Sequence, residues 1–271
     1  MRTRHWRALI AAALSALVII PLGGQPVRAT AAEQPPQAYL DWTKVVVAAI
    51  SAIGSWASSA NTEEAIKQAT TQILSAVNSA KAEILAQMET IAVAELRACA
   101  NHAFIEYIDI ERMAPDNMQQ FAQNATGCAV QIASTLPAIS DAARKDQLGF
   151  ALSIVSPIAL NARGRTGLTT EALASTLLSA QEHIAATLLP NCWSYVPALQ
   201  EPDFPRPRPG DYIGWDLFCE AYNYTSFASG YGVFRYPNEG PTEVHWAPLR
   251  DQASSTTSRG IAIAVIPLLR R

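Results

Sequence analysis

Four polar residues between positions 95 and 109 fall at spacings that could bind a metal ion or transfer protons. At about 100° per residue around an α-helix, Glu95, His102, Glu106 and Asp109 all follow the line of apolar residues that begins at Ile66. A histidine and a glutamate four residues apart share one face of a helix, which suits a divalent cation or an acid–base pair. The sequence thus offers His102, Glu106 and Asp109 as candidate catalytic residues.

The same stretch also fits a helix whose polar residues face the solvent. A supercoiled helix with 3.5 residues per turn would rotate His102 by roughly 100° away from the line of Ile66, and Phe104, Tyr107 and Ile108 would then face inward. The sequence has no Glu-x-x-His motif of the kind found in helical proteins that bind two metal ions. It also lacks G-x-S-x-G, H-E-x-x-H and Walker motifs. We therefore favour the solvated helix and predict no metal site and no cofactor.

A second candidate site lies among the aromatic residues of the C-terminal third. Of the 21 aromatic residues in the chain, 13 lie between positions 193 and 246. Such rings stack on sugars or anchor protein interfaces, and they equally fill the core of a small sheet. The sequence leaves both uses open. The candidate binding residues are Trp193, Trp215, Tyr222, Tyr224, Tyr231 and Trp246.

The first 31 residues have the pattern of a secretory signal peptide. Three arginines precede an apolar run of 13 residues from Ala8 to Ile20, and Ala29-Thr30-Ala31 offers a cleavage site. A membrane-spanning helix needs about 18 or more apolar residues, so this run is too short for an anchor. We predict a secreted, extracellular protein that keeps no transmembrane anchor after the signal is removed.

The chain after residue 31 is acidic. It holds 16 of the 20 Lys and Arg residues and all 23 Asp and Glu residues, which gives a formal charge of −7. Binding to phosphates requires a basic surface, so the charge argues against a nucleic-acid partner. Because 49% of the residues are hydrophobic, we expect a folded protein rather than a disordered one.

Residues 32–190 are predicted to form a helical domain. They are rich in alanine, leucine and isoleucine at helical spacings. One very long helix is expected from Asn61 to about Glu111, because no Gly or Pro interrupts it. We predict an antiparallel bundle of about five helices, near residues 38–57, 61–111, 116–135, 141–162 and 170–189.

Residues 191–271 are predicted to form a proline-rich strip and a small β region packed on or beside the bundle. Five prolines lie between positions 197 and 211. β-like runs follow at 212–224, 232–236 and 242–246, and the apolar segment from Gly260 to Leu269 is predicted as a buried strand. The predicted fold class is therefore α+β, mainly α, with a small aromatic-rich β region at the C-terminal end.

Four cysteines in an exported chain predict two disulfides. Cys99 and Cys128 lie at equal distances from the break in helical pattern at residues 113–115, so they should be neighbours in an antiparallel helical hairpin. Cys192 and Cys219 then pair by elimination. Loops of this length stabilise a fold by roughly 3–4 kcal/mol each.

These features favour a secreted, non-enzymatic binding protein that is stabilised by two disulfides and engages an extracellular protein or a glycan. The first alternative is an extracellular hydrolase or metal-binding protein that uses His102, Glu106 and Asp109. The second is a membrane-active helical protein, similar in architecture to helical pore formers.

Overall fold

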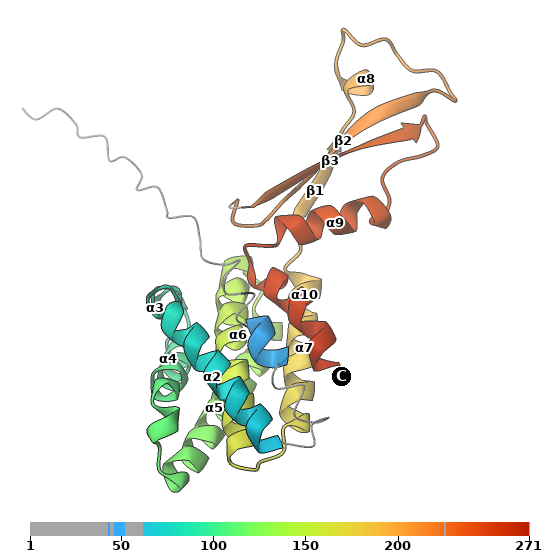
Figure 1. The fold of residues 1–271 in the computed structure, drawn as a ribbon. Helices are drawn as coiled ribbons and strands as arrows, with labels where there is room; N and C mark the ends of the chain where they lie inside the picture. The colour runs from blue at the N-terminus through green and yellow to red at the C-terminus, as the bar shows by residue number, and fades with distance from the viewer. Residues whose placement is uncertain (1–42, 44–45, 52–61, 225, 271) are drawn as a thin grey trace, which may run out of the picture. The chain divides into compact units, whose positions relative to one another are not determined.

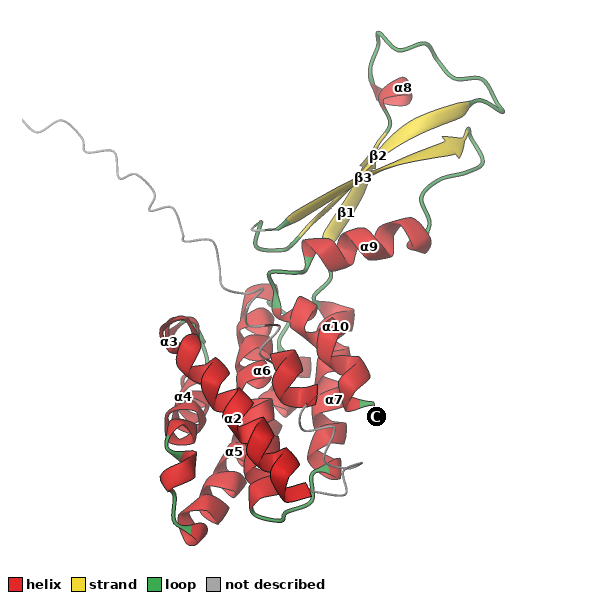
Figure 2. Cartoon of the chain, viewed as in Figure 1, coloured by secondary structure: helices red, strands yellow, loops and turns green. Residues whose placement is uncertain are grey.

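The computed structural model describes residues 43, 46–51, 62–224 and 226–270. The predicted signal peptide and most of the predicted first helix lie outside the described residues. Within them, the protein is mainly helical and has a small three-stranded antiparallel sheet toward the C-terminus (Figures 1 and 2). The predicted α+β class is confirmed at this level. The prediction of about five helices is wrong, because the described residues form ten α-helices.

The helices before the sheet match the predicted ones in part. Residues 46–51 are helical, and α5, α6 and α7 correspond to the three helices predicted between 116 and 189. Asp141 begins α6 by accepting a hydrogen bond from the Arg144 N–H at 2.8 Å. The bounds are α2 Thr62–Ser79, α3 Lys81–Glu89, α4 Ala94–Ile108, α5 Pro115–Thr135, α6 Ala142–Arg165 and α7 Glu171–Thr187, with short 3₁₀ turns at Ile110–Arg112 and Leu136–Ala138.

The predicted long helix from Asn61 to Glu111 is wrong. The segment is divided into α2, α3 and α4, with breaks at Ala80 and at residues 90–93. α3 ends at Thr90, whose backbone N–H and hydroxyl both donate to the carbonyl of Gln87, at 3.0 and 2.6 Å. The helical phase counted from Ile66 is therefore lost before α4 begins.

One hydrophobic core joins these helices. It is centred on α6, where every residue from Leu148 to Ala162 is buried, and α6 contacts α2, α3, α4, α5 and α7. A helix that is apolar on all sides has to be surrounded by others. The largest fully buried side chains include Phe104 and Tyr107 of α4.

The sheet consists of β1 Asn191–Tyr195, β2 Tyr212–Glu220 and β3 Phe227–Arg235, in that order. The short helix α8, Pro197–Gln200, lies between β1 and β2 in the chain. Both strand pairs are antiparallel, with Trp193 opposite Phe218 and Glu220 opposite Phe227. The β-like run predicted at 212–224 is a strand as far as Glu220, where β2 ends, and residues 221–224 form a turn. The run predicted at 232–236 corresponds to the second half of β3, which ends at Arg235.

Two segments predicted as β are helices. α9, Glu243–Ala253, stands where a run was predicted at 242–246, and α10, Ser258–Leu269, replaces the predicted buried strand. Their buried residues follow helical spacing, with Leu249 and Ala253 four apart in α9 and Ile261 and Val265 four apart in α10. A short apolar run is compatible with either a helix or a strand. The packing of the buried residues of α9 and α10 therefore decides that these segments are helices.

Helix α10 brings the chain back to the helical core. It contacts α7 and α6, and its Ile261, Ala262 and Val265 belong to the same buried cluster as the earlier helices. The sheet and α9 are therefore inserted in the chain between two neighbouring helices, α7 and α10.

Gly149 allows α6 to approach the start of α10. A Cβ at this position would lie 2.8 Å from the Cβ of Ser258, which is too close for either backbone to accept without moving. We expect Gly149→Ala to lower the free energy of unfolding by about 1–3 kcal/mol, measured by urea denaturation. Gly127→Ala in α5 is the matched control, since a Cβ there meets nothing within 4 Å and removal of a helical glycine stabilises. Equal effects of the two substitutions would contradict this close approach.

Candidate binding site

The residues proposed for a metal or catalytic site lie on the solvent side of α4. His102 and Glu106 are exposed, and so is Asp109 just beyond the helix, where it forms an exposed ion pair of 3.3 Å with an arginine three residues later. The inward face is formed by Phe104 and Tyr107. Across the described part of the chain, no three His, Cys, Asp or Glu side chains are grouped to hold a metal ion. The solvated helix is the arrangement that the structure shows.

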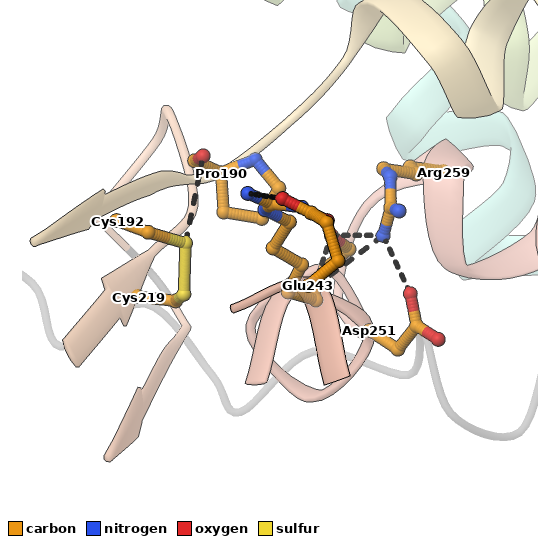
Figure 3. Close-up of a disulfide and its surroundings, with 8 residues drawn as sticks. Pro190, Cys192, Cys219, Glu243, Asp251 and Arg259 are labelled. Atoms are coloured by element: carbon orange, nitrogen blue, oxygen red, sulfur yellow. Dashed lines mark hydrogen bonds and ion pairs between the residues drawn. A yellow bond between two sulfur atoms is a disulfide. The ribbon is translucent and has the colours of Figure 1, made fainter. Parts of the chain in front are cut away.

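Both predicted disulfides are present. Cys99–Cys128 joins α4 to α5, and Cys192–Cys219 joins β1 to β2. Figure 3 shows the second bond, whose two cysteines are direct partners in the antiparallel pair. All four cysteines are therefore used in cross-links.

The sheet has one buried and one exposed face, because successive residues of a strand point to opposite sides. On the buried face, Leu217, Cys219 and Ala228 pack against Leu249 and Ala253 of α9. Trp215 and Trp246 add partly buried rings to this small core. These two predicted binding residues therefore hold α9 on the sheet.

The opposite face carries four exposed aromatic side chains and the half-buried Phe218, and we call it the aromatic face: Trp193, Tyr212, Phe218, Phe227 and Tyr231. Trp193, Phe218 and Phe227 form a triad in which the ring centroids lie 5.7, 6.2 and 5.7 Å apart. Trp193 is 40% exposed and Phe227 is 51% exposed. The three rings of the triad thus pack against one another, and Trp193 and Phe227 also expose ring surface to the solvent.

Tyr231 is positioned by a glycine of the neighbouring strand. A Cβ at Gly214 would lie 2.9 Å from ring carbons of Tyr231, so the tyrosine ring rests directly against this glycine. Glycine in a strand permits such close approach of an aromatic ring from the next strand. The ring is therefore preorganised although Tyr231 is 69% exposed, which reduces the entropy lost when a ligand covers it.

Two carboxylates lie among these rings on the central strand. Asp216 is paired across the sheet with Tyr195 and Tyr231, and Glu220 is paired with Phe227. Both carboxylates belong to partly buried residues. A third acid lies at the β1 edge, where the Tyr195 hydroxyl donates to Glu201. That hydrogen bond raises the pKa of Tyr195, so the hydroxyl keeps its proton.

The structure separates the predicted aromatic residues by role. Trp193 and Tyr231 lie on the aromatic face, whereas Tyr224 lies in the turn between β2 and β3 and is 81% exposed. The sequence interpretation missed Tyr212, Phe218 and Phe227 of the aromatic face. Their alternate positions within β2 and β3 are the signal that identifies them once the strands are known.

Tyr222 belongs to a buried polar contact that joins α6, the end of β2 and α10. Its hydroxyl donates to Asp146 Oδ2 at 2.6 Å, and the Ser258 N–H donates to Asp146 Oδ1 at 2.6 Å. Burial raises the pKa of Asp146, and the two hydrogen bonds offset part of this effect. Tyr222 therefore has a structural role.

Arg259 makes a second connection between the inserted segment and the helices. Its guanidinium donates to the carbonyl of Ala185 in α7 at 3.0 Å and to Ser254 Oγ at 2.9 Å. It also donates to Asp251 of α9 at 3.1 Å, as Figure 3 shows. Because Arg259 is only 8% exposed, these bonds replace water and fix the end of α9 next to α7 and α10.

The chain matches no protein-family model, and comparison with curated proteins and with solved structures finds no significant similarity. Among the described helices, none combines the length and the hydrophobicity that crossing a membrane requires. The aromatic face is thus the feature from which a function can be inferred.

Proposed function

We propose that this protein is secreted and acts, without catalysis, by binding an extracellular protein or a glycan through its aromatic face. The main support is the clustering of exposed apolar residues. Among the described residues, eleven large hydrophobic side chains are exposed, and five of them share this one face: Trp193, Tyr212, Phe227, Tyr231 and Val233. Single exposed apolar residues are ordinary, whereas a contiguous group indicates an interaction site.

The remaining features are compatible with this role. The signal-like first 31 residues and the two disulfides support export into an oxidising compartment. We further propose that the helices of residues 32–190 form an antiparallel bundle that serves as a scaffold for the binding region within residues 191–271. A rigid scaffold of this kind positions a binding surface with little loss of entropy.

Trp193→Ala combined with Phe227→Ala should weaken binding by the purified, oxidised protein. Exposed anchor rings of this type commonly contribute about 2 kcal/mol or more to affinity, so a loss of roughly thirtyfold is expected. The measurement is binding to printed arrays of extracellular glycans and of synthetic peptides.

Tyr224→Ala is the control for this experiment, because Tyr224 is more exposed than either ring and lies in the turn outside the aromatic face. It should bind the array like the wild-type protein. Undiminished binding by the double variant, or an equal loss in Tyr224→Ala, would contradict the assignment of the aromatic face.

A further inference from the structure

Negative charge is concentrated around the aromatic triad. On β2, residues 216, 218 and 220 point to the same side, so Asp216 and Glu220 lie on either side of the Phe218 ring. Glu201 adds a third acid at the edge. Arg235 is the register partner of Tyr212 and lies four residues from Tyr231, about 13 Å along β3. The half of the face that holds the triad is therefore acidic.

Among the residues that the structure describes, Asp216 and Glu220 have no counter-ion of their own. Within the described chain, the ion pairs involve other acids, and neither of these carboxylates accepts a side-chain or backbone hydrogen bond. Both residues are partly buried beside aromatic rings. Partial desolvation strengthens the attraction of a carboxylate for an incoming cation, because less water screens the charge.

The rings next to these carboxylates also attract cations. An ammonium or guanidinium group within about 6 Å of a ring centroid is stabilised by the ring quadrupole, most strongly by tryptophan. Phe227 is the strand partner of Glu220, and Tyr231 is the strand partner of Asp216. A cation at either place would contact a ring and a carboxylate together.

We propose that the aromatic face binds an extended, basic segment of another polypeptide. This inference rests on the proposed function and specifies the chemistry of its ligand. Asp216 and Glu220 are four residues apart on β2, which corresponds to about 13 Å. An extended peptide with arginine or lysine at positions i and i+4 has the same spacing. Its two cations reach the two carboxylates, and the residue at i+2 lies over the triad.

The probe is the peptide acetyl-Arg-Ser-Thr-Ser-Arg-amide, titrated into the oxidised protein at low salt while the fluorescence of tryptophan is recorded. Asp216→Asn combined with Glu220→Gln should weaken binding roughly tenfold. Raising the salt concentration to about 0.15 M should weaken binding to the wild-type protein, since exposed charges are then screened beyond about 8 Å.

The matched control is Glu63→Gln combined with Glu64→Gln. These exposed acids lie in the first turn of α2, so the control changes the net charge by the same amount and leaves the sheet intact. It should bind the peptide like the wild-type protein. Far-UV circular dichroism verifies that both double variants are folded.

The outcomes separate this inference from the proposed function. Peptide binding that depends on both Asp216/Glu220 and Trp193, and not on the α2 acids, supports the inference. Peptide binding that is equal in all variants overturns it. A neutral chito-oligosaccharide that binds in a Trp193-dependent manner, in the absence of peptide binding, overturns the basic ligand and retains the binding function. If neither probe binds, the basic ligand is overturned and the array experiment decides the proposed function.

Discussion

Replacing Cys192 and Cys219 by alanine should lower the free energy of unfolding by about 3–4 kcal/mol and unfold the sheet first. The bond spans 27 residues, and the chain-entropy model gives this magnitude for a loop of that length. Among the described residues, the core beneath α9 is small: five buried residues form one cluster, Leu217, Cys219, Ala228, Leu249 and Ala253, and Ile213 and Phe234 are also buried on this face of the sheet. A small sheet with so little apolar burial depends on a covalent cross-link. Guanidinium denaturation measures the loss of stability, and near-UV circular dichroism of tryptophan reports the sheet.

Cys99→Ala combined with Cys128→Ala is the matched control. Its loop is almost equal in length, with a separation of 29 residues, so the chain-entropy contribution is nearly the same. The cross-linked helices, α4 and α5, also pack against α6 in the large core. The near-UV signal of Trp193, Trp215 and Trp246 should therefore persist. Persistence of that signal in both variants would show that the sheet does not depend on its own disulfide. Loss of it in both would show that the dependence is not specific to the Cys192–Cys219 bond.

Asp146→Ala should lower the free energy of unfolding by about 2–5 kcal/mol, because it leaves two buried donors without an acceptor. These donors are the Tyr222 hydroxyl and the Ser258 N–H, each 2.6 Å from the carboxylate. An unsatisfied buried polar group costs about 1–3 kcal/mol. Asp146→Asn should cost much less, since its carbonyl can accept from Ser258 and its amide can donate to the tyrosine oxygen. Urea denaturation of the three proteins measures the difference.

The stability difference between Asp146→Asn and the wild-type protein should depend on pH. Burial raises the pKa of Asp146 above its ordinary value of 3.8. Between the unfolded and the folded pKa, the folded protein holds a proton that the unfolded chain has released. The contribution of Asp146 to stability is therefore full below the unfolded pKa and is lost as the pH rises through the folded pKa.

In Asp146→Asn, the side chain at position 146 does not titrate. The stability of this variant relative to the wild-type protein should therefore increase as the pH rises from about 3.9. His183 has the opposite pH dependence, because burial and Lys145 lower its pKa. Both proteins retain His183, so its effect cancels in the difference. A difference that stays constant with pH would show that Asp146 has the same pKa in the folded and unfolded states.

The disulfide between α4 and α5 was predictable because a local signal marks the turn. Met113 and Ala114 are extended, and Pro115 occupies the first turn of α5. This places the hairpin where the sequence suggests, and the cysteines on its two arms meet. The breaks between α2, α3 and α4 carry no comparable signal, since they contain neither glycine nor proline. The phase argument for His102 failed for that reason.

The aromatic face was predictable in composition but not in arrangement. The number of tryptophans and tyrosines after residue 190 indicated a core or a binding surface, and the structure places some of these residues in a core and leaves others exposed. Trp193 and Trp215 lie on opposite faces of the sheet because of the register between β1 and β2. This register depends on contacts between residues distant in sequence. Likewise, α10 was mistaken for a strand because its partners, α6 and α7, are distant in the sequence, as the 112 residues between Asp146 and Ser258 and the 74 residues between Ala185 and Arg259 show.

The disulfide between Cys192 and Cys219 also fixes the register between β1 and β2. Because these sulfurs are exactly opposed in the ladder, a shift of β1 by a single residue would separate them and turn Trp193 toward α9. Oxidation therefore selects the alignment of β1 and β2 in which Cys192 faces Cys219 and Trp193 lies on the exposed face. Formation of this disulfide therefore also determines which side chains of β1 lie on the exposed face of the sheet.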